Sequence, residues 1–290
     1  MGSEVMLGQP LGGALGGALG LRPAVGGGAA ARTIQMLLVG GGGAGDSGQY
    51  IFDLTWGMCS AGGGGGEVLE VELVAPPPGA YAVEIGPGGV AYGTPGGGNI
   101  HGGQTKFGPI LRAIGGGGGG ALFSQSSYEN AYATTGFNTA GAPRAAWTPA
   151  GRVLGGFSGG TSFANYSSIV SGGGGGGSGG PGGNATSGAP GLGGVGKFSS
   201  LTGLPVEYGR GGTGGHTSVG RGAPAFGPGG GGGGGRPQES NTLWGEPGNA
   251  GFLAFRYLTG TQTWTGGNVT QFDSWTIHTF TADGTATRTA

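Results

Sequence analysis

Runs of five or more consecutive glycines are the feature that most constrains how this chain can fold. They cover residues 62–66, 115–120, 172–177 and 229–235, and glycine supplies 84 of the 290 residues. Glycine in a helix costs about 1 kcal/mol per residue relative to alanine, and a glycine strand has no side chains to pack. The strict Gly-X-Y period of collagen is absent. Two interpretations remain: a disordered low-complexity chain, or a fold that uses glycine backbone as its building material.

An extended left-handed helix of the polyproline-II type suits such runs. It has about three residues per turn, a rise of roughly 3.1 Å and no internal hydrogen bonds, so every amide can bond sideways to a neighbouring segment. Because no side chains keep glycine segments apart, several can lie in contact as a polyglycine-II bundle. Fixing each residue costs about 1–2 kcal/mol, and each lateral hydrogen bond returns about 0.5–1.5 kcal/mol. This balance is near zero, so strands must close and stabilise the bundle.

Segments with strand patterns bracket the glycine runs. Residues 34–39 form an apolar run, and residues 67–74 alternate so that leucine and valine face one side and glutamate the other. After the turn at Pro76–Gly79, residues 81–85 alternate again, which predicts the hairpin partner of the 67–74 strand.

The C-terminal part of the chain carries further strand signals. Residues 252–258 predict a strand, and residues 275–280 and 285–289 flank Asp283-Gly284, the strongest short hairpin signal in the chain. Residues 121–170 are rich in aromatic side chains and predict long loops. The predicted fold class is mostly β and irregular, a polyglycine-II helix bundle framed by antiparallel β-strands, with almost no α-helix.

The glycine runs recur at nearly constant distances. They start at residues 62, 115, 172 and 229, which are 53, 57 and 57 residues apart. This spacing predicts internal duplication of a unit of about 57 residues, longer than common solenoid repeats. Similar short motifs precede glycine-rich segments, and we expect the aromatic residue of each to pack in the interior. These aromatic residues are Phe107, Phe163, Phe198 and Phe226.

Charge and cysteine content exclude several classes of function. The chain has 12 Lys and Arg against 13 Asp and Glu, so it lacks the electrostatic footprint of a nucleic-acid-binding protein. Cys59 is the only cysteine, which excludes an internal disulfide and a cysteine-based zinc cluster. Its expected role is that of a small buried apolar group. Leu11, Leu15 and Leu19 are diluted by glycine, so neither a signal peptide nor membrane insertion is predicted.

The abundance of glycine creates chance matches to catalytic motifs. Residues 40–45 satisfy G-x-G-x-x-G after a predicted strand, but residues 46–60 lack the period of the helix that would meet a pyrophosphate. Residues 191–197 approach a P-loop, yet Phe198 follows where Ser or Thr is required. Residues 156–160 match G-x-S-x-G without its strand–helix frame. We therefore expect a protein that is not an enzyme and that has no cofactor and no bound metal.

The order of motifs resembles the glycine-rich domain of bacteriophage tail proteins. The matching blocks are residues 34–43, 62–68, 78–89, 102–108 and 251–257. The similarity covers about residues 32–258. It implies a virion tail-fibre, adhesin or minor tail protein with packed polyglycine-II helices, whose connecting loops touch the host receptor. Residues 275–281 resemble a strand that commonly precedes this domain, but here they follow it. Either the order of the segments is permuted, or the tail begins a truncated further copy of the domain.

Three regions are expected along the chain. Residues 1–31 form an N-terminal Gly/Leu/Ala arm that docks or is flexible, and within it Leu11 to Leu21 could dock into a neighbouring virion protein. Residues 32–258 form the glycine-rich polyglycine-II domain with its repeats. Residues 259–290 form a C-terminal β-hairpin segment.

The aromatic loops are the best candidates for receptor contact, since Tyr and Trp give rigid contact area at low entropic cost. A small core that caps the bundle is the alternative role for these rings. The candidate residues are Tyr128, Tyr132, Phe137, Trp147 and Tyr166.

The resemblance also implies partners and location. The expected partners are other virion tail proteins and a host surface receptor, either a glycan or an outer-membrane protein, and analogy with tail fibres predicts a homotrimer. The expected location is the phage tail, extracellular after host lysis. A capsid decoration or head-fibre protein without receptor binding is the alternative. A polyglycine-II ice-binding protein is a remote alternative that requires a regular G-x-x pattern and a flat Thr or Ala face.

Overall fold

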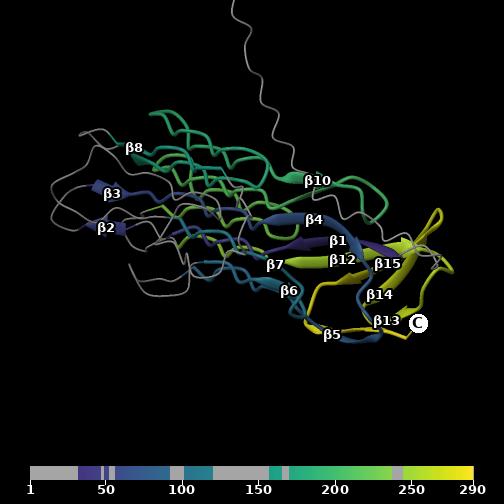
Figure 1. Ribbon diagram of the computed structural model, residues 1–290. Coiled ribbons are helices and arrows are strands. Elements are labelled where there is room, and N and C mark those ends of the chain that lie inside the picture. Colours follow the sequence, from purple (N-terminus) through teal and green to yellow (C-terminus); the bar gives the residue numbers. More distant parts are fainter. Residues whose placement is uncertain are drawn as a thin grey trace, which may run out of the picture. The chain divides into compact units, whose positions relative to one another are not determined.

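The structure is a computed structural model that consists of strands and irregular segments (Figure 1). It describes residues 32–46, 49–51, 56–91, 101–119, 157–164, 170–236 and 244–289. Within these ranges there is no α-helix, and the strand pairs are antiparallel, which confirms the predicted mostly β and irregular class. The predicted arm at residues 1–31 lies outside the described residues.

The first sheet has the strand order β14-β15-β12-β1-β4. Its strands are β1 (Thr33–Val39), β4 (Val68–Val74), β12 (Phe252–Leu258), β14 (Asn268–Phe272) and β15 (Trp275–Phe280). In the central strand β1, Leu38 pairs with Leu253 on one side and with Leu69 on the other. The strands expected at residues 34–39, 67–74 and 252–258 are therefore confirmed.

The second sheet has the strand order β13-β16-β5-β6-β7. Its strands are β5 (Gly79–Glu84), β6 (Thr105–Phe107), β7 (Leu111–Ala113), β13 (Trp264–Thr265) and β16 (Gly284–Arg288). Both sheets combine strands from the two ends of the described chain, so residues 259–289 share their sheets with the glycine-rich region.

The predicted hairpin between residues 67–74 and 81–85 is wrong. β4 pairs with β1 in the first sheet, whereas β5 pairs with β16 and β6 in the second. The prolines at positions 76–78 have no N–H and a fixed φ, so this connection carries the chain in extended form from one sheet to the other.

The hairpin predicted at Asp283-Gly284 is wrong for a similar reason. β15 and β16 belong to different sheets, and the Asp283 carboxylate accepts a hydrogen bond from the Ile85 amide at 2.7 Å, which holds the crossing in place. The hairpin formed in this region is β14–β15, which turns at Asp273 with a φ of 52°.

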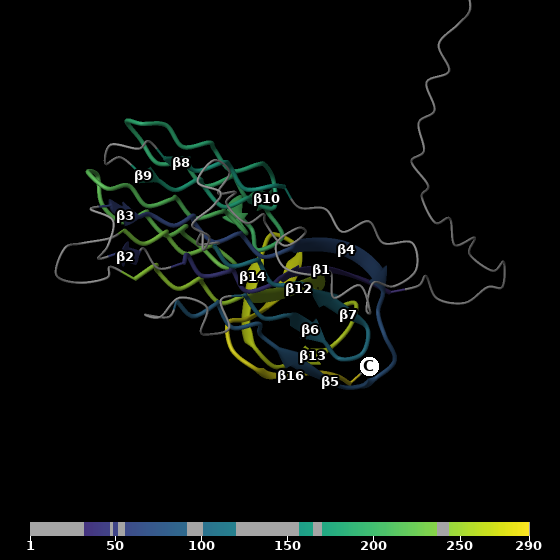
Figure 2. The ribbon, with the colours of Figure 1, turned by 90° about the vertical axis from the view of Figure 1, so that its left-hand side faces the viewer.

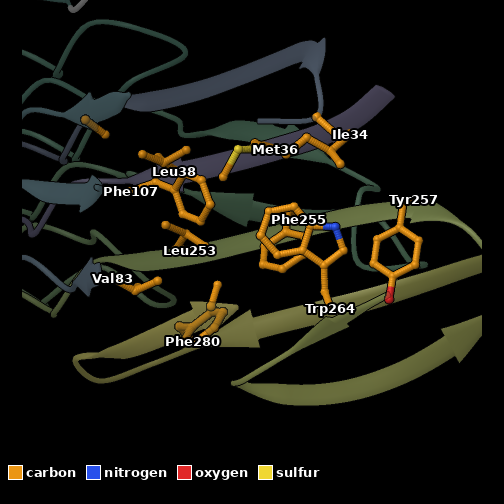
Figure 3. Packing of buried hydrophobic residues seen from close by; sticks show 13 residues of the cluster. Ile34, Met36, Leu38, Val83, Phe107, Leu253, Phe255, Tyr257, Trp264 and Phe280 are labelled. Atoms are coloured by element: carbon orange, nitrogen blue, oxygen red, sulfur yellow. The ribbon is translucent and has the colours of Figure 1, made fainter. Parts of the chain in front are cut away.

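The main hydrophobic core lies between the two sheets (Figure 3). Phe107 is fully buried there, and its ring stacks on Tyr81 with 5.3 Å between centroids. Phe255 and Trp264 lie against it, with their ring centroids 5.0 Å apart. Each such side chain stabilises the fold by about 1.5–3 kcal/mol through burial. The sheets are thus the source of the apolar free energy that glycine segments cannot supply.

A smaller core lies on the opposite face of the first sheet. The hairpin of β10 (Lys197–Ser199) and β11 (Val206–Tyr208) covers this face, and Tyr208 stacks on Phe252 with 5.6 Å between centroids. Burial is the main cause that raises the pKa of Tyr208.

Short hairpins lead directly into glycine segments at several points of the chain. The pairs are β2 (Gln49–Ile51) with β3 (Trp56–Met58), β6 with β7, β8 (Phe163–Ala164) with β9 (Val170–Ser171), and β10 with β11. The expectation that each motif buries its aromatic residue holds for Phe107, and Phe163 is partly buried. Phe198 is 63% exposed and Phe226 is 85% exposed, because neither enters the space between the sheets. The duplication itself stays a prediction.

Candidate functional site: a cross-linked glycine block

Extended glycine-rich segments lie side by side next to the sheets (Figures 1 and 2). We call them the glycine block. It comprises residues 40–46, 60–67, 86–89, 101–103, 114–119, 172–178, 180–186, 189–196, 209–216, 222–226, 229–236 and 245–251. Backbone amides of each segment donate to carbonyls of other segments, so the described glycine runs are cross-linked laterally and are not isolated coil.

The hydrogen bonds of residues 60–67 follow a three-residue period. Every third amide of residues 60–67 donates to the same neighbouring segment, and the accepting carbonyls of that segment are also three residues apart. Amides 60, 63 and 66 donate to carbonyls 235, 232 and 229, amides 62 and 65 to carbonyls 173 and 176, and amides 64 and 67 to carbonyls 117 and 114. A helix with three residues per turn produces this period, whereas a strand repeats after two residues.

Many interior glycines of the block have no room for a side chain, although Ala44 and Ala61 are buried in it. A Cβ added to Gly63 would lie 2.2 Å from the Gly43 carbonyl oxygen, and one added to Gly42 would lie 2.0 Å from the Gly230 carbonyl oxygen. These distances are shorter than any real Cβ contact. Glycine is therefore required at these positions, which explains the long runs.

The peripheral segment 189–196 carries an exposed side chain three residues after another. Leu192 and Val195 expose 69% and 50% of their surface, while the intervening Gly193 and Gly194 face other segments at Cβ distances of 1.9 and 2.2 Å. A segment with more neighbouring segments thus contains more glycine.

The apparent nucleotide-binding motif at residues 40–45 lies inside the block. The amides of Gly41 and Gly42 donate to the carbonyls of Gly103 and Asn249 at 2.9 and 2.8 Å, and the amide of Gly43 donates to another glycine carbonyl. These N–H groups are occupied and do not form a free anion-binding nest. The amides of Gly191 and Gly194, in the P-loop-like motif, are likewise bonded within the block.

The end of the block opposite the sheets, here called the far end, is defined by residues 44–46, 60, 119, 215–216 and 235–236. Hydrogen bonds place these residues together: the Gly119 amide donates to Ala44, and the Gly235 amide donates to Asp46. Residues 40, 67 and 251, in contrast, adjoin β1, β4 and β12.

Ser60 joins segments at the far end. Its side chain is buried; the hydroxyl contacts the Asp46 carbonyl and accepts a hydrogen bond from the Gly235 amide at 2.9 Å. The preceding Cys59 is partly buried, and desolvation raises the pKa of its thiol to about 12, although Arg236 acts in the opposite direction. The thiol stays protonated at neutral pH and is a poor nucleophile.

The histidines have structural partners. His278 is fully buried, stacks on Phe255 at 4.7 Å, and has a pKa that desolvation lowers. Nδ1 of His216 accepts hydrogen bonds from the Ser218 and Val219 amides, and Nδ1 of His101 accepts one from the Gly118 amide. In the described part of the chain, no group of three or more His, Cys, Asp or Glu residues could hold a metal ion.

The predicted receptor-contact residues lie outside the described residues. They are Tyr128, Tyr132, Phe137, Trp147 and Tyr166. Gly119, at the far end, precedes the connection that contains the first four. Tyr166 lies between β8 and β9, and Ser171 of β9 forms a bridge with His216, also at the far end.

Two exposed apolar residues at the far end were missed by the sequence reasoning. Val219 is 65% exposed in the turn after His216, and Trp244 is 47% exposed beside Gly245, which lies against Gly45. A bulky residue at the point where a glycine segment begins or ends is the signal that could have found them.

The comparison with protein families agrees with this architecture. The model of a family described as a glycine-rich domain matches residues 22–258. The chain belongs to the glycine-rich domain family. Searches of curated proteins and of solved structures found no match. None of the described segments is a helix long and apolar enough to cross a membrane.

Proposed function

We propose that this glycine-rich domain protein is a structural component of a bacteriophage tail, in a fibre or at the tail tip, and that it attaches the particle to a host cell. The observation that carries the proposal is the laterally cross-linked glycine block, which joins the packed sheets at one end and has Gly119, after which the chain continues toward Tyr128, at the other. Contact residues on loops are most effective when a rigid scaffold positions them.

The scaffold in this proposal is a bundle of polyglycine-II helices. The three-residue period of hydrogen bonding supports this assignment, as does the absence of room for a Cβ at Gly42 and Gly63. Because each interior segment is bonded on several sides, bending it would break several hydrogen bonds at once. The block would therefore transmit force between particle and receptor with little deformation.

The proposed partners are other tail proteins and a host surface receptor, either a glycan or an outer-membrane protein. Tyr128, Tyr132, Phe137, Trp147 and Tyr166 would supply the contact area. Val219 and Trp244, which are exposed at the far end, would add to it. Analogy with tail fibres makes a homotrimer part of the proposal. The occupied amides of residues 40–43 and the protonated Cys59 thiol support a role other than catalysis.

Adsorption to cells tests the proposal. The purified full chain should bind the cells that are infected by phage particles carrying this protein. The double variant Tyr132→Ala/Trp147→Ala should lose that binding. Phe198→Ala, which removes an exposed ring from strand β10 next to the first sheet, is the matched control and should bind like the wild type. Unchanged adsorption of the double variant would refute receptor contact through these residues. Immunogold labelling on the head of the particle would replace the tail assignment by a decoration role.

A further inference from the structure

The two five-stranded sheets have four edge strands, and three of them are protected against pairing with another chain. A free sheet edge presents unpaired N–H and C=O groups, and proteins protect it with short strands or charged side chains. β13 and β7 are short, with two and three residues. β4 is longer, but Glu70 and Glu72 are exposed on it.

β14 is the exception. It runs from Asn268 to Phe272 without a charged residue, a proline or a bulge, and all five of its residues pair in regular register with β15. Every residue of the strand is exposed; Val269 exposes 50% and Phe272 41% of its surface. Within the described residues β14 pairs with β15 alone, so its outer edge is open.

Apolar side chains are exposed on and next to this strand. The Phe272 ring of β14 lies over Gly203, where an added Cβ would be 3.0 Å from Cδ2. The next residue, Leu204, is 71% exposed. Exposed apolar residues gathered beside an open edge mark a protein interface.

We propose that a second copy of this chain adds its own β14 to this edge, antiparallel and about a twofold axis through Thr270. A twofold interface must be complementary to itself. In this register Thr270 faces Thr270, Val269 faces Gln271 and Asn268 faces Phe272, so no like charges meet, and threonine pairs are favourable on sheets. The first sheets of the two copies then form one continuous sheet. This pairing is independent of the phage assignment and gives assemblies with an even number of chains, including a pair of homotrimers.

Sedimentation equilibrium of the full chain tests the proposal. The wild type should have a mass that is an even multiple of 27.6 kDa. Thr270→Lys and Thr270→Glu each place like charges opposite each other across the axis, so each variant alone should have half the wild-type mass. Their dissociation constants should rise about tenfold or more, which corresponds to about 1.4 kcal/mol. An equimolar mixture of the two variants should restore the wild-type mass.

Val74→Lys is the matched control, because Val74 is also an exposed β-branched residue on an edge strand, and its mass should not change. A wild-type mass equal to an odd multiple of the chain would overturn the proposal, as would Thr270→Lys protein that keeps the full mass. If a single variant loses its native circular dichroism, the mixture decides: restored mass supports the β14 pairing, and a mass that stays halved refutes it.

Discussion

Gly63→Ala should destabilise the protein far more than an ordinary surface substitution. The added Cβ would lie 2.2 Å from the Gly43 carbonyl oxygen, and opening that contact to 3.0 Å requires a shift of 0.8 Å. The hydrogen bond from the Gly43 amide to Gly64 is 2.8 Å long, so the shift lengthens it to about 3.6 Å, beyond hydrogen-bonding distance. The bond from the Gly232 amide to the Gly43 carbonyl is disturbed in the same way.

Each buried backbone group left without a partner costs about 1–3 kcal/mol. Replacing glycine also reduces the entropy of the unfolded chain, which returns about 0.4–1 kcal/mol. The broken hydrogen bond leaves two such groups, so the net loss for Gly63→Ala should be about 1–6 kcal/mol, a large share of the 5–15 kcal/mol that typically separates the folded and unfolded states.

Urea unfolding followed by circular dichroism and tryptophan fluorescence measures this loss. Gly188→Ala is the matched control, since Gly188 has no atom within 4 Å of an added Cβ. The control should unfold at the wild-type urea concentration or slightly above it. Gly63→Ala protein that is as stable as the control would refute the argument that lateral backbone contacts exclude side chains from the block.

Three further outcomes are expected. Phe107→Ala should cost about 3–5 kcal/mol because the ring fills the core, while Phe198→Ala should change stability by less than about 0.5 kcal/mol; equal losses in urea unfolding would contradict the assigned burial. The pKa of His278 is lowered below 6.5 in the folded protein, so on acidification the unfolded chain takes up the proton at a higher pH than the folded chain does. The melting temperature should therefore be steady above pH 6.5 and fall as the pH drops below it. His278→Phe should make this fall of the melting temperature with pH less steep. Because the pKa of Cys59 is about 12, the folded protein should react with iodoacetamide at pH 8 much more slowly than the urea-unfolded chain; equal rates would exclude a buried thiol.

The sequence was informative where one physical requirement dominates. An apolar run located β1, and the alternation of apolar residues located β4, because a strand with one buried face needs that period. The glycine runs predicted lateral backbone bonding, because a segment without side chains has only its amides and carbonyls to bond with.

Other features depend on the whole fold and could not be predicted. Turn signals at Pro76–Gly79 and Asp283-Gly284 marked changes of direction, but they could not tell which sheet receives the next strand. Phe107 and Phe198 stand in similar motifs, yet only the first enters the space between the sheets. All glycine amides are chemically alike, so the neighbours of each segment are set by the strands that close the block.

The exposed residues of the candidate site illustrate the same limit. Val219 and Trp244 are exposed at the far end because of the places where their segments turn, and neither lies in a recognisable motif. The edge strand β14 has the composition of an ordinary strand, and only the sheet order identifies it as an edge.

Amide hydrogen exchange of protein labelled with [15N]glycine, followed by NMR, tests the glycine block most directly. The amides of Gly62 to Gly66 all donate to carbonyls of other segments. They should exchange only when the protein unfolds globally, as slowly as the amides of β1. Exchange of these glycines at the rate of an unstructured peptide, while β1 stays protected, would contradict the cross-linked block.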